Sequence, residues 1–181
     1  SRRQASVRQQ LLDIQKAAAK YYYYMLSRPE GRQALDYLTG RGLTKETLIH
    51  FGLGYSPKFG NGLYHYLKQS GYSDALIKES GLVTYDEKRG PHDKFWNRVI
   101  FPIMDANNRV VGFGGRVRGE GEPKYLNSPE TKIFDKSRTL YGLNFARVSR
   151  KPYFIICEGY MDVISMHQAG FTNTIASLGT A

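Results

Sequence analysis

The chain has 181 residues, and its 26 Lys and Arg against 16 Asp and Glu give a formal net charge of +10. With 41% hydrophobic and 13% aromatic residues, it can bury a core, which excludes a disordered tail and a fibrous repeat. No apolar run approaches the roughly 18 residues of a membrane span, and the opening residues carry no signal-peptide core. We therefore expect a cytoplasmic protein without a membrane partner.

The cysteine and histidine content and the net charge limit which metals and partners this chain is expected to bind. A single cysteine, Cys157, excludes an internal disulfide, and the four histidines show no zinc-ligand spacing, so any metal here is expected on oxygen ligands. A positive balance favours a polyanion, because each Lys or Arg that neutralises a phosphate releases a counterion. Solubility explains part of this charge. The lack of a basic amphipathic helix or lipidation signal places nucleic acid ahead of a membrane surface.

The first half of the chain is predicted to be mostly helical. In a first helix over residues 4–26, apolar positions recur at spacings of three and four, namely Leu11, Ile14, Ala18, Tyr21 and Met25. Of the four tyrosines at 21–24, one or two should face the core. Further helices are expected over 31–39, 44–51, 62–69 and 73–80, with Thr44 and Ser73 as N-caps.

Strand patterns begin near Phe95. Residues 99–104 and 109–116 are rich in β-forming residues on either side of a turn-like segment, which predicts a hairpin. Pro102 predicts an edge or bulge position in its strand. The glycines at 112–115 open no helix and therefore indicate close backbone approach, not a dinucleotide fingerprint. A helical pattern returns over 136–147.

The last segment predicts a βαβ unit. The apolar run 153–157 is typical of a strand buried on both faces, with Cys157 as a small buried hydrophobe. Residues 160–169 follow with helical spacing, and 172–178 form a second strand that is parallel to the first. We predict an α/β fold: a basic, helical α+β subdomain over 1–135, followed by this unit over 136–181. Because two parallel strands do not make a whole fold, we expect natural sequence beyond both ends.

Two carboxylates follow the first strand of this unit. Glu158 stands at the strand end and Asp162 in the first turn of the helix. Ligands of open α/β sheets bind beyond the carboxyl ends of the strands, so both groups are placed to hold Mg²⁺ or to act as acid or base. An alternative is that Asp162 only complements the helix dipole and Glu158 is a solvated loop residue. Two carboxylates seldom complete a Mg²⁺ site, so further acidic ligands are expected in later sequence.

Basic residues on the hairpin predict a phosphate-binding groove. Arg116 and Arg118 lie two residues apart and should share one strand face, and Arg98 opens the partner strand. We expect Arg98 and Arg116 to line one groove. For Arg118, a solvated loop charge is the preferred interpretation.

Several long motifs occur in a fixed order. They are RVIFPI (98–103), VGFGGR (111–116), PKYLNSPET (123–131), LYGL (140–143), EGYMDV (158–163) and ASLGT (176–180), with shorter matches at 37–38, 41–43 and 53–55. Together they resemble the RNA polymerase core of bacterial DnaG-type DNA primases, of which the last two motifs resemble the opening of the Toprim fold. The resemblance covers nearly the whole chain.

The resemblance implies a DNA-directed RNA polymerase, a nucleotidyltransferase that lays down short RNA primers for replication. It implies that Glu158 is the catalytic Toprim glutamate, with Asp162 as its acidic neighbour, and that both bind Mg²⁺ or Mn²⁺. The residues that it assigns to a nucleic-acid or nucleotide channel are Arg116, Lys124, Tyr125 and Asn127, with Arg41 as a further template or nucleotide contact.

The resemblance also implies partners and missing parts. Single-stranded DNA template, nucleoside triphosphates and an RNA–DNA primer duplex would bind the core, and a replicative helicase would bind a domain absent here. Zinc would belong to an absent N-terminal domain and not to this chain. Because the Asp-x-Asp pair of the family is also absent, we expect an incomplete metal site and no polymerisation by this chain alone.

Two other classes stay open at this point. A Toprim nuclease or topoisomerase shares the glutamate but cuts strands, and the basic motifs upstream of Glu158 speak against it. A single-strand-binding module in which the Toprim part is a relic would need no metal. An Asp-x-Asp after a further strand would favour metal catalysis over this third class.

Overall fold

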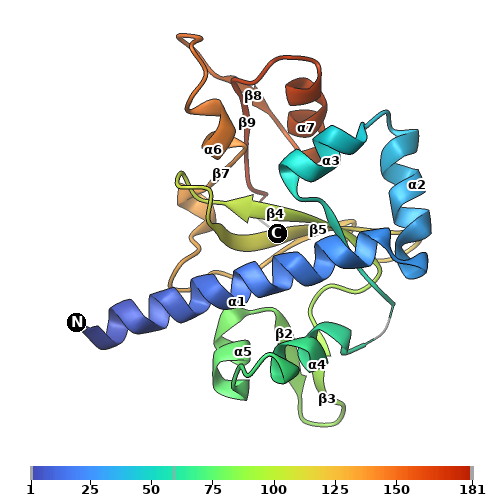
Figure 1. Cartoon of the computed structure of the whole chain (residues 1–181), viewed down its shortest axis with the longest axis vertical. Coiled ribbons are helices and arrows are strands. Elements are labelled where there is room, and N and C mark those ends of the chain that lie inside the picture. Colours follow the sequence, from blue (N-terminus) through green and yellow to red (C-terminus); the bar gives the residue numbers. More distant parts are fainter. Residues whose placement is uncertain (1, 59, 180–181) are drawn as a thin grey trace.

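The computed structural model describes residues 2–58 and 60–179, and helices dominate the first 80 residues (Figure 1). Its helices are α1 (Arg2–Ser27), α2 (Arg32–Gly40), α3 (Lys45–Phe51), α4 (Gly62–Gln69), α5 (Asp74–Ser80), α6 (Leu143–Ala146) and α7 (Tyr160–Gln168), with single 3-10 turns η1 (Pro29–Gly31) and η2 (Lys136–Arg138). Its strands are β1 (Gly54–Ser56), β2 (Val83–Asp86), β3 (Gly90–Asp93), β4 (Arg98–Met104), β5 (Val110–Val117), β6 (Tyr125–Asn127), β7 (Leu140–Tyr141), β8 (Ile155–Cys157) and β9 (Thr174–Ser177).

The long helix α1 crosses the middle of the molecule beside β4 and β5 (Figure 1). Its early core positions are buried as predicted, but Tyr22 and not Tyr21 continues the buried face. Tyr22 follows Leu11 by just over three full turns at 3.6 residues per turn, so it lies on the same face as Leu11, whereas Tyr21 is rotated away. The Tyr22 ring packs edge-on against Phe113 of β5, with 5.2 Å between centroids. The prediction that only part of the tyrosine run faces the core is confirmed.

The central sheet has the strand order β1-β4-β5-β6, and all its pairings are antiparallel. The predicted hairpin is confirmed as β4 and β5. Pro102 is accommodated because β1 pairs only with residues 98–100 of β4, and because a bulge follows between Ile103 and Met104. The glycines at 112–115 permit close approach, as predicted: a Cβ at Gly115 would lie 2.7 Å from the Phe95 ring.

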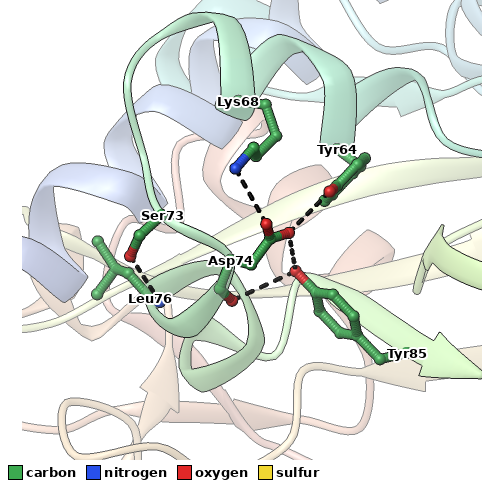
Figure 2. A network of polar contacts seen from close by, with 6 residues as sticks. All are labelled: Tyr64, Lys68, Ser73, Asp74, Leu76 and Tyr85. Carbon is green, nitrogen blue, oxygen red and sulfur yellow. Dashed lines mark hydrogen bonds and ion pairs between the residues drawn. The ribbon is translucent and has the colours of Figure 1, made fainter.

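A small unit of α4, α5, β2 and β3 lies on the other side of α1 (Figure 1). Its helices match the predicted spans, and the Ser73 hydroxyl caps α5 by accepting a hydrogen bond from the amide of Leu76, as the Thr44 hydroxyl caps α3. Figure 2 shows how the Asp74 carboxylate joins three elements, because it accepts hydrogen bonds from Tyr64 at 2.7 Å, Lys68 at 3.0 Å and Tyr85 at 3.1 Å. These groups are largely solvent-exposed, so each contact contributes little on its own.

The second sheet has the order β7-β9-β8. Strands β8 and β9 are parallel and joined through α7, which confirms the predicted βαβ unit. The helix predicted over 136–147 is wrong, because η2, β7 and α6 divide that segment. The backbone turns at Gly142, whose φ is +85°, and a Cβ there would lie 2.9 Å from Val163 Cγ1. All three strands of this sheet lie after residue 136, and a subdomain boundary there stays a prediction.

The strand β8 is not buried on both faces, contrary to the sequence-based expectation. Its central residue Ile156 is 75% exposed, the preceding Tyr153 and Phe154 are also exposed, and Cys157 is half-buried. The cause is position: among the described residues β8 pairs only with β9 and forms an edge of the sheet. Within the same residues, no helix is both long and apolar enough to cross a membrane.

Candidate active site

A pocket of about 330 Å³ opens where the second sheet meets the central sheet. Glu158 and Asp162 line it from the end of β8 and the first turn of α7, and Tyr125 and Asn127 line it from β6. Tyr160 also belongs to its wall. Both carboxylates, predicted to face one crevice, line the same pocket.

Both carboxylates are exposed side chains at this pocket. Gly159 precedes α7 with extended backbone, which turns the chain between Glu158 and the helix that carries Asp162. None of the ion pairs formed by described residues includes either group. Their oxygens are therefore available to a ligand.

The donor chemistry of this pair fits a hard divalent cation in part. Carboxylate oxygens are the ligands that Mg²⁺ prefers, although Mg²⁺ sites commonly add further carboxylates, waters or substrate phosphates. In residues 2–58 and 60–179, no group of three or more His, Cys, Asp or Glu side chains is arranged to hold a metal ion. Glu158 and Asp162 thus fit as members of a larger ligand set.

Tyr160 anchors the pocket, a role that was not predicted from the sequence. Its ring stacks on Phe101 of β4 at 4.9 Å between centroids, and its hydroxyl donates a hydrogen bond to Asn127 Oδ1 at 2.5 Å. Burial raises the pKa of Tyr160, which keeps the hydroxyl a donor. The available signal was Gly114, which stands opposite Phe101 in the sheet register and leaves room for this ring.

Arg116 lies beside the pocket. The register pairs it with Tyr125 of β6, which lines the pocket. Its guanidinium carbon lies 5.9 Å from the centroid of the Tyr125 ring and 4.7 Å from that of Tyr37 on α2. Both distances suit cation–π attraction, which holds this half-buried cation between two elements. The structure therefore brings Tyr125 and Asn127 into one pocket with the two carboxylates, and it places Arg116 against Tyr125.

Arg98 does not share this groove, which corrects the sequence-based expectation. The register pairs Arg98 with Val117 and Val99 with Arg116, and side chains alternate along a strand, so Arg98 and Arg116 face opposite sides of the sheet. Arg98 is only 5% exposed. Its guanidinium donates hydrogen bonds to the carbonyls of Pro123 at 2.8 Å, Gly115 at 3.1 Å and Lys124 at 3.3 Å. Burial lowers its pKa.

Lys124 and Arg41 lie outside the pocket lining. Lys124 is exposed one residue before β6. Arg41 is exposed at the end of α2, where the adjoining Gly42 carbonyl accepts a hydrogen bond from Gln168 at 2.7 Å. That contact lies at the C-terminal end of α7, whereas Asp162 lies near its N-terminus.

A basic, helical first part joined to a Toprim βαβ unit is the architecture of a primase catalytic core, and comparison with known proteins agrees. Residues 21–147 match the family described as the DNA primase catalytic core, N-terminal domain, and residues 153–181 match the Toprim domain. The chain belongs to the bacterial DnaG-type DNA primase family. This result confirms the resemblance and the fold class, and the match over 21–147 favours a primase over a Toprim nuclease or topoisomerase.

The similar proteins are longer than this chain. The DNA primases of Deinococcus radiodurans and Clostridium acetobutylicum are 47% and 45% identical over 97% and 94% of the chain, which spans only 30% and 28% of their lengths. Among solved structures, a DnaG primase catalytic domain bound to single-stranded DNA is 38% identical with a TM-score of 0.89, covering 98% of this chain and 58% of that one. The RNA polymerase domain of Mycobacterium tuberculosis primase DnaG is 35% identical with a TM-score of 0.90, covering 96% and 58%.

Proposed function

We propose that this chain holds template and nucleotide beside the catalytic carboxylates of a DNA primase. The complete protein would synthesise short RNA primers on single-stranded DNA by nucleotidyl transfer. The observation that carries the proposal is that Glu158 and Asp162 share one pocket with Tyr125, and that Arg116 packs directly against that tyrosine. A similar catalytic domain that binds single-stranded DNA supports it.

The side chains in and around the pocket have different proposed roles in binding. Arg116 would grip a phosphate oxygen pair, because a guanidinium offers parallel donors in one plane. The Tyr125 ring is 37% exposed and would stack on a base. Lys124 and Arg41 would add positive charges near the sugar-phosphate backbone of the template. Asn127 would act as a positioning residue, because its amide oxygen holds the Tyr160 hydroxyl.

The carboxylates are the proposed catalytic and metal-binding residues. Glu158 and Asp162 would hold Mg²⁺ or Mn²⁺ as two members of a larger set of oxygen ligands. A bound divalent cation would neutralise and orient the phosphates of the incoming nucleotide. Because these two oxygen donors form only part of such a site, the 181-residue chain is proposed to bind nucleic acid without polymerising.

The remaining partners are proposed for the complete protein. Its substrates would be a single-stranded template, ribonucleoside triphosphates and the RNA–DNA duplex that they form. A replicative helicase would bind a separate domain, and zinc would belong to another. The protein would work in the bacterial cytoplasm at the replication fork.

The test is Mg²⁺-dependent incorporation of ribonucleotides on a single-stranded template by the full-length primase. Glu158→Gln keeps the shape of the side chain but removes its charge, so incorporation should fall at least 100-fold. Glu87→Gln, at an exposed turn between β2 and β3, is the matched control and should match the wild type. Near-normal incorporation by Glu158→Gln would count against the proposal.

A further inference from the structure

A second arginine shares the aromatic support of Arg116. The guanidinium carbon of Arg118 lies 5.4 Å from the centroid of the Tyr37 ring, and that of Arg116 lies 4.7 Å from the same centroid. Arg118 follows the end of β5, two residues after Arg116, so the strand geometry sends both side chains to one face. The ring of Tyr37 on α2 thus contacts two guanidiniums, both from the end of β5, about 80 residues later in the sequence.

The backbone at Arg118 is held firmly, so its side chain leaves from a fixed point. Its amide donates a hydrogen bond to the Asn97 carbonyl at 2.8 Å, and its own carbonyl accepts one from Asn97 Nδ2 at 3.0 Å. The Tyr55 hydroxyl in turn donates to Asn97 Oδ1 at 2.7 Å. Arg118 is half-buried, which corrects its interpretation as a solvated loop charge.

Neither cation has a carboxylate partner among the described ion pairs. The Nε of Arg118 is buried without a hydrogen-bond partner in the described residues. Buried polar groups are nearly always satisfied, so this guanidinium has a donor that no described protein group satisfies. Two guanidiniums on one ring also repel each other, and an anion between them removes that repulsion.

We propose that Arg118 is a second phosphate-binding arginine, and that Tyr37 is the positioning residue that holds Arg116 and Arg118 as a pair. The ligand is a phosphate group, carried either by the template backbone or by the triphosphate of a nucleotide. Two guanidiniums present the bidentate donors that phosphate oxygens prefer. The inference rests on the proposed function, because it gives the same face of the sheet a second contact.

The arginine variants test the ligand. Binding of a fluorescent single-stranded oligonucleotide to the 181-residue chain is measured by anisotropy across a salt series, and displacement by ATP is measured alongside. Arg118→Ala should weaken one of these two interactions five- to tenfold. If the template supplies the phosphate, the slope of log affinity against log salt should also fall by about 0.7, the value for one single-strand contact. Arg138→Ala, an exposed arginine paired with Asp135, is the control.

The tyrosine variants test the positioning role. Tyr37→Phe keeps the ring and should bind as the wild type does, whereas Tyr37→Leu should weaken binding five- to tenfold although no charge is lost. In the Tyr37→Leu background, Arg118→Ala should cost much less than it does in the wild type, because coupled residues are not additive. If a thermal melt shows that Tyr37→Leu does not fold, Arg118→Lys is tested in its place. This variant keeps the charge but loses the planar guanidinium, so it should bind more weakly than the wild type.

The outcomes separate the two proposals. The inference is overturned if Arg118→Ala binds both the oligonucleotide and ATP as well as Arg138→Ala does, although Arg116→Ala binds more weakly. If Arg116→Ala also changes nothing, the proposed function itself fails. A Tyr37→Phe variant as weak as Tyr37→Leu would show that the ring does not position the arginines.

Discussion

Gly114 lies directly against the ring of Tyr160. A Cβ added at Gly114 would come within 2.4 Å of Tyr160 Cζ, which no side-chain contact allows. The same ring stacks on Phe101 and edge-on against Tyr141, at 4.9 Å and 4.7 Å between centroids, so it is already packed on two further sides. The glycine in the central sheet therefore sets the position of an aromatic wall of the active-site pocket.

Gly114→Ala should destabilise the protein. Forcing a methyl group into a packed contact typically costs about 1–3 kcal/mol, and here the neighbour that must yield is held on two further sides. The free energy of unfolding is measured by urea denaturation. Gly40→Ala, at the end of α2 where an added Cβ would meet no atom within 4 Å, is the control and should change stability little. Equal stability of the two variants would contradict the packing argument.

Arg98 should behave as a structural residue and not as a nucleic-acid contact. Arg98→Met keeps the length of the side chain but leaves the carbonyls of Gly115, Pro123 and Lys124 without their donor, and we expect a loss of about 1–3 kcal/mol in urea denaturation. Its salt slope for oligonucleotide binding should equal that of the wild type, whereas Arg116→Ala should lower that slope. Wild-type stability together with a lowered slope in Arg98→Met would reverse this assignment.

Asp93 should make stability fall as pH rises from about 4 to about 6. Its carboxylate accepts hydrogen bonds from the Leu63 and Tyr64 amides at the start of α4, but burial raises its pKa to about 6. The folded state therefore binds a proton in this window that the unfolded state has already lost, so ionisation costs stability as pH rises.

Asp93→Asn removes this titration. Between pH 4 and pH 6 the wild type should lose up to about 3 kcal/mol of unfolding free energy relative to the variant, since each pKa unit corresponds to 1.36 kcal/mol. The comparison cancels His167, whose pKa is lowered by burial and which acts in the opposite sense in both proteins. Parallel stability profiles for the two proteins would contradict the raised pKa.

Local chemistry explains what the sequence predicted well in the fold. The helices α3 and α5 begin where Thr44 and Ser73 cap them, and a cap is decided by a few neighbouring residues. The burial of β8 depends on which strands lie beside it, and an apolar run such as 153–157 carries no information about that. The space at the Gly142 turn is likewise limited by Val163, which lies on α7 about 20 residues later in the sequence.

The same limit applies to the candidate site. Glu158 and Asp162 were placed in one pocket because the carboxyl ends of parallel strands meet at one edge. The face of Arg98 follows from the register between β4 and β5, which composition does not specify. Tyr37 and Tyr160 act through contacts with segments far along the chain, so their roles depend on which segments pack together.

The carboxylates and the cationic side chains are proposed to be two parts of one site with separable roles. The measurement is template affinity and Mg²⁺-dependent ribonucleotide incorporation, taken on the same preparations of full-length Glu158→Gln and Arg116→Ala. We expect Glu158→Gln to bind template within twofold of the wild type while incorporation is lost, and Arg116→Ala to show both weaker template binding and reduced incorporation. Retained incorporation by Glu158→Gln, or unchanged binding and synthesis by Arg116→Ala, would contradict it.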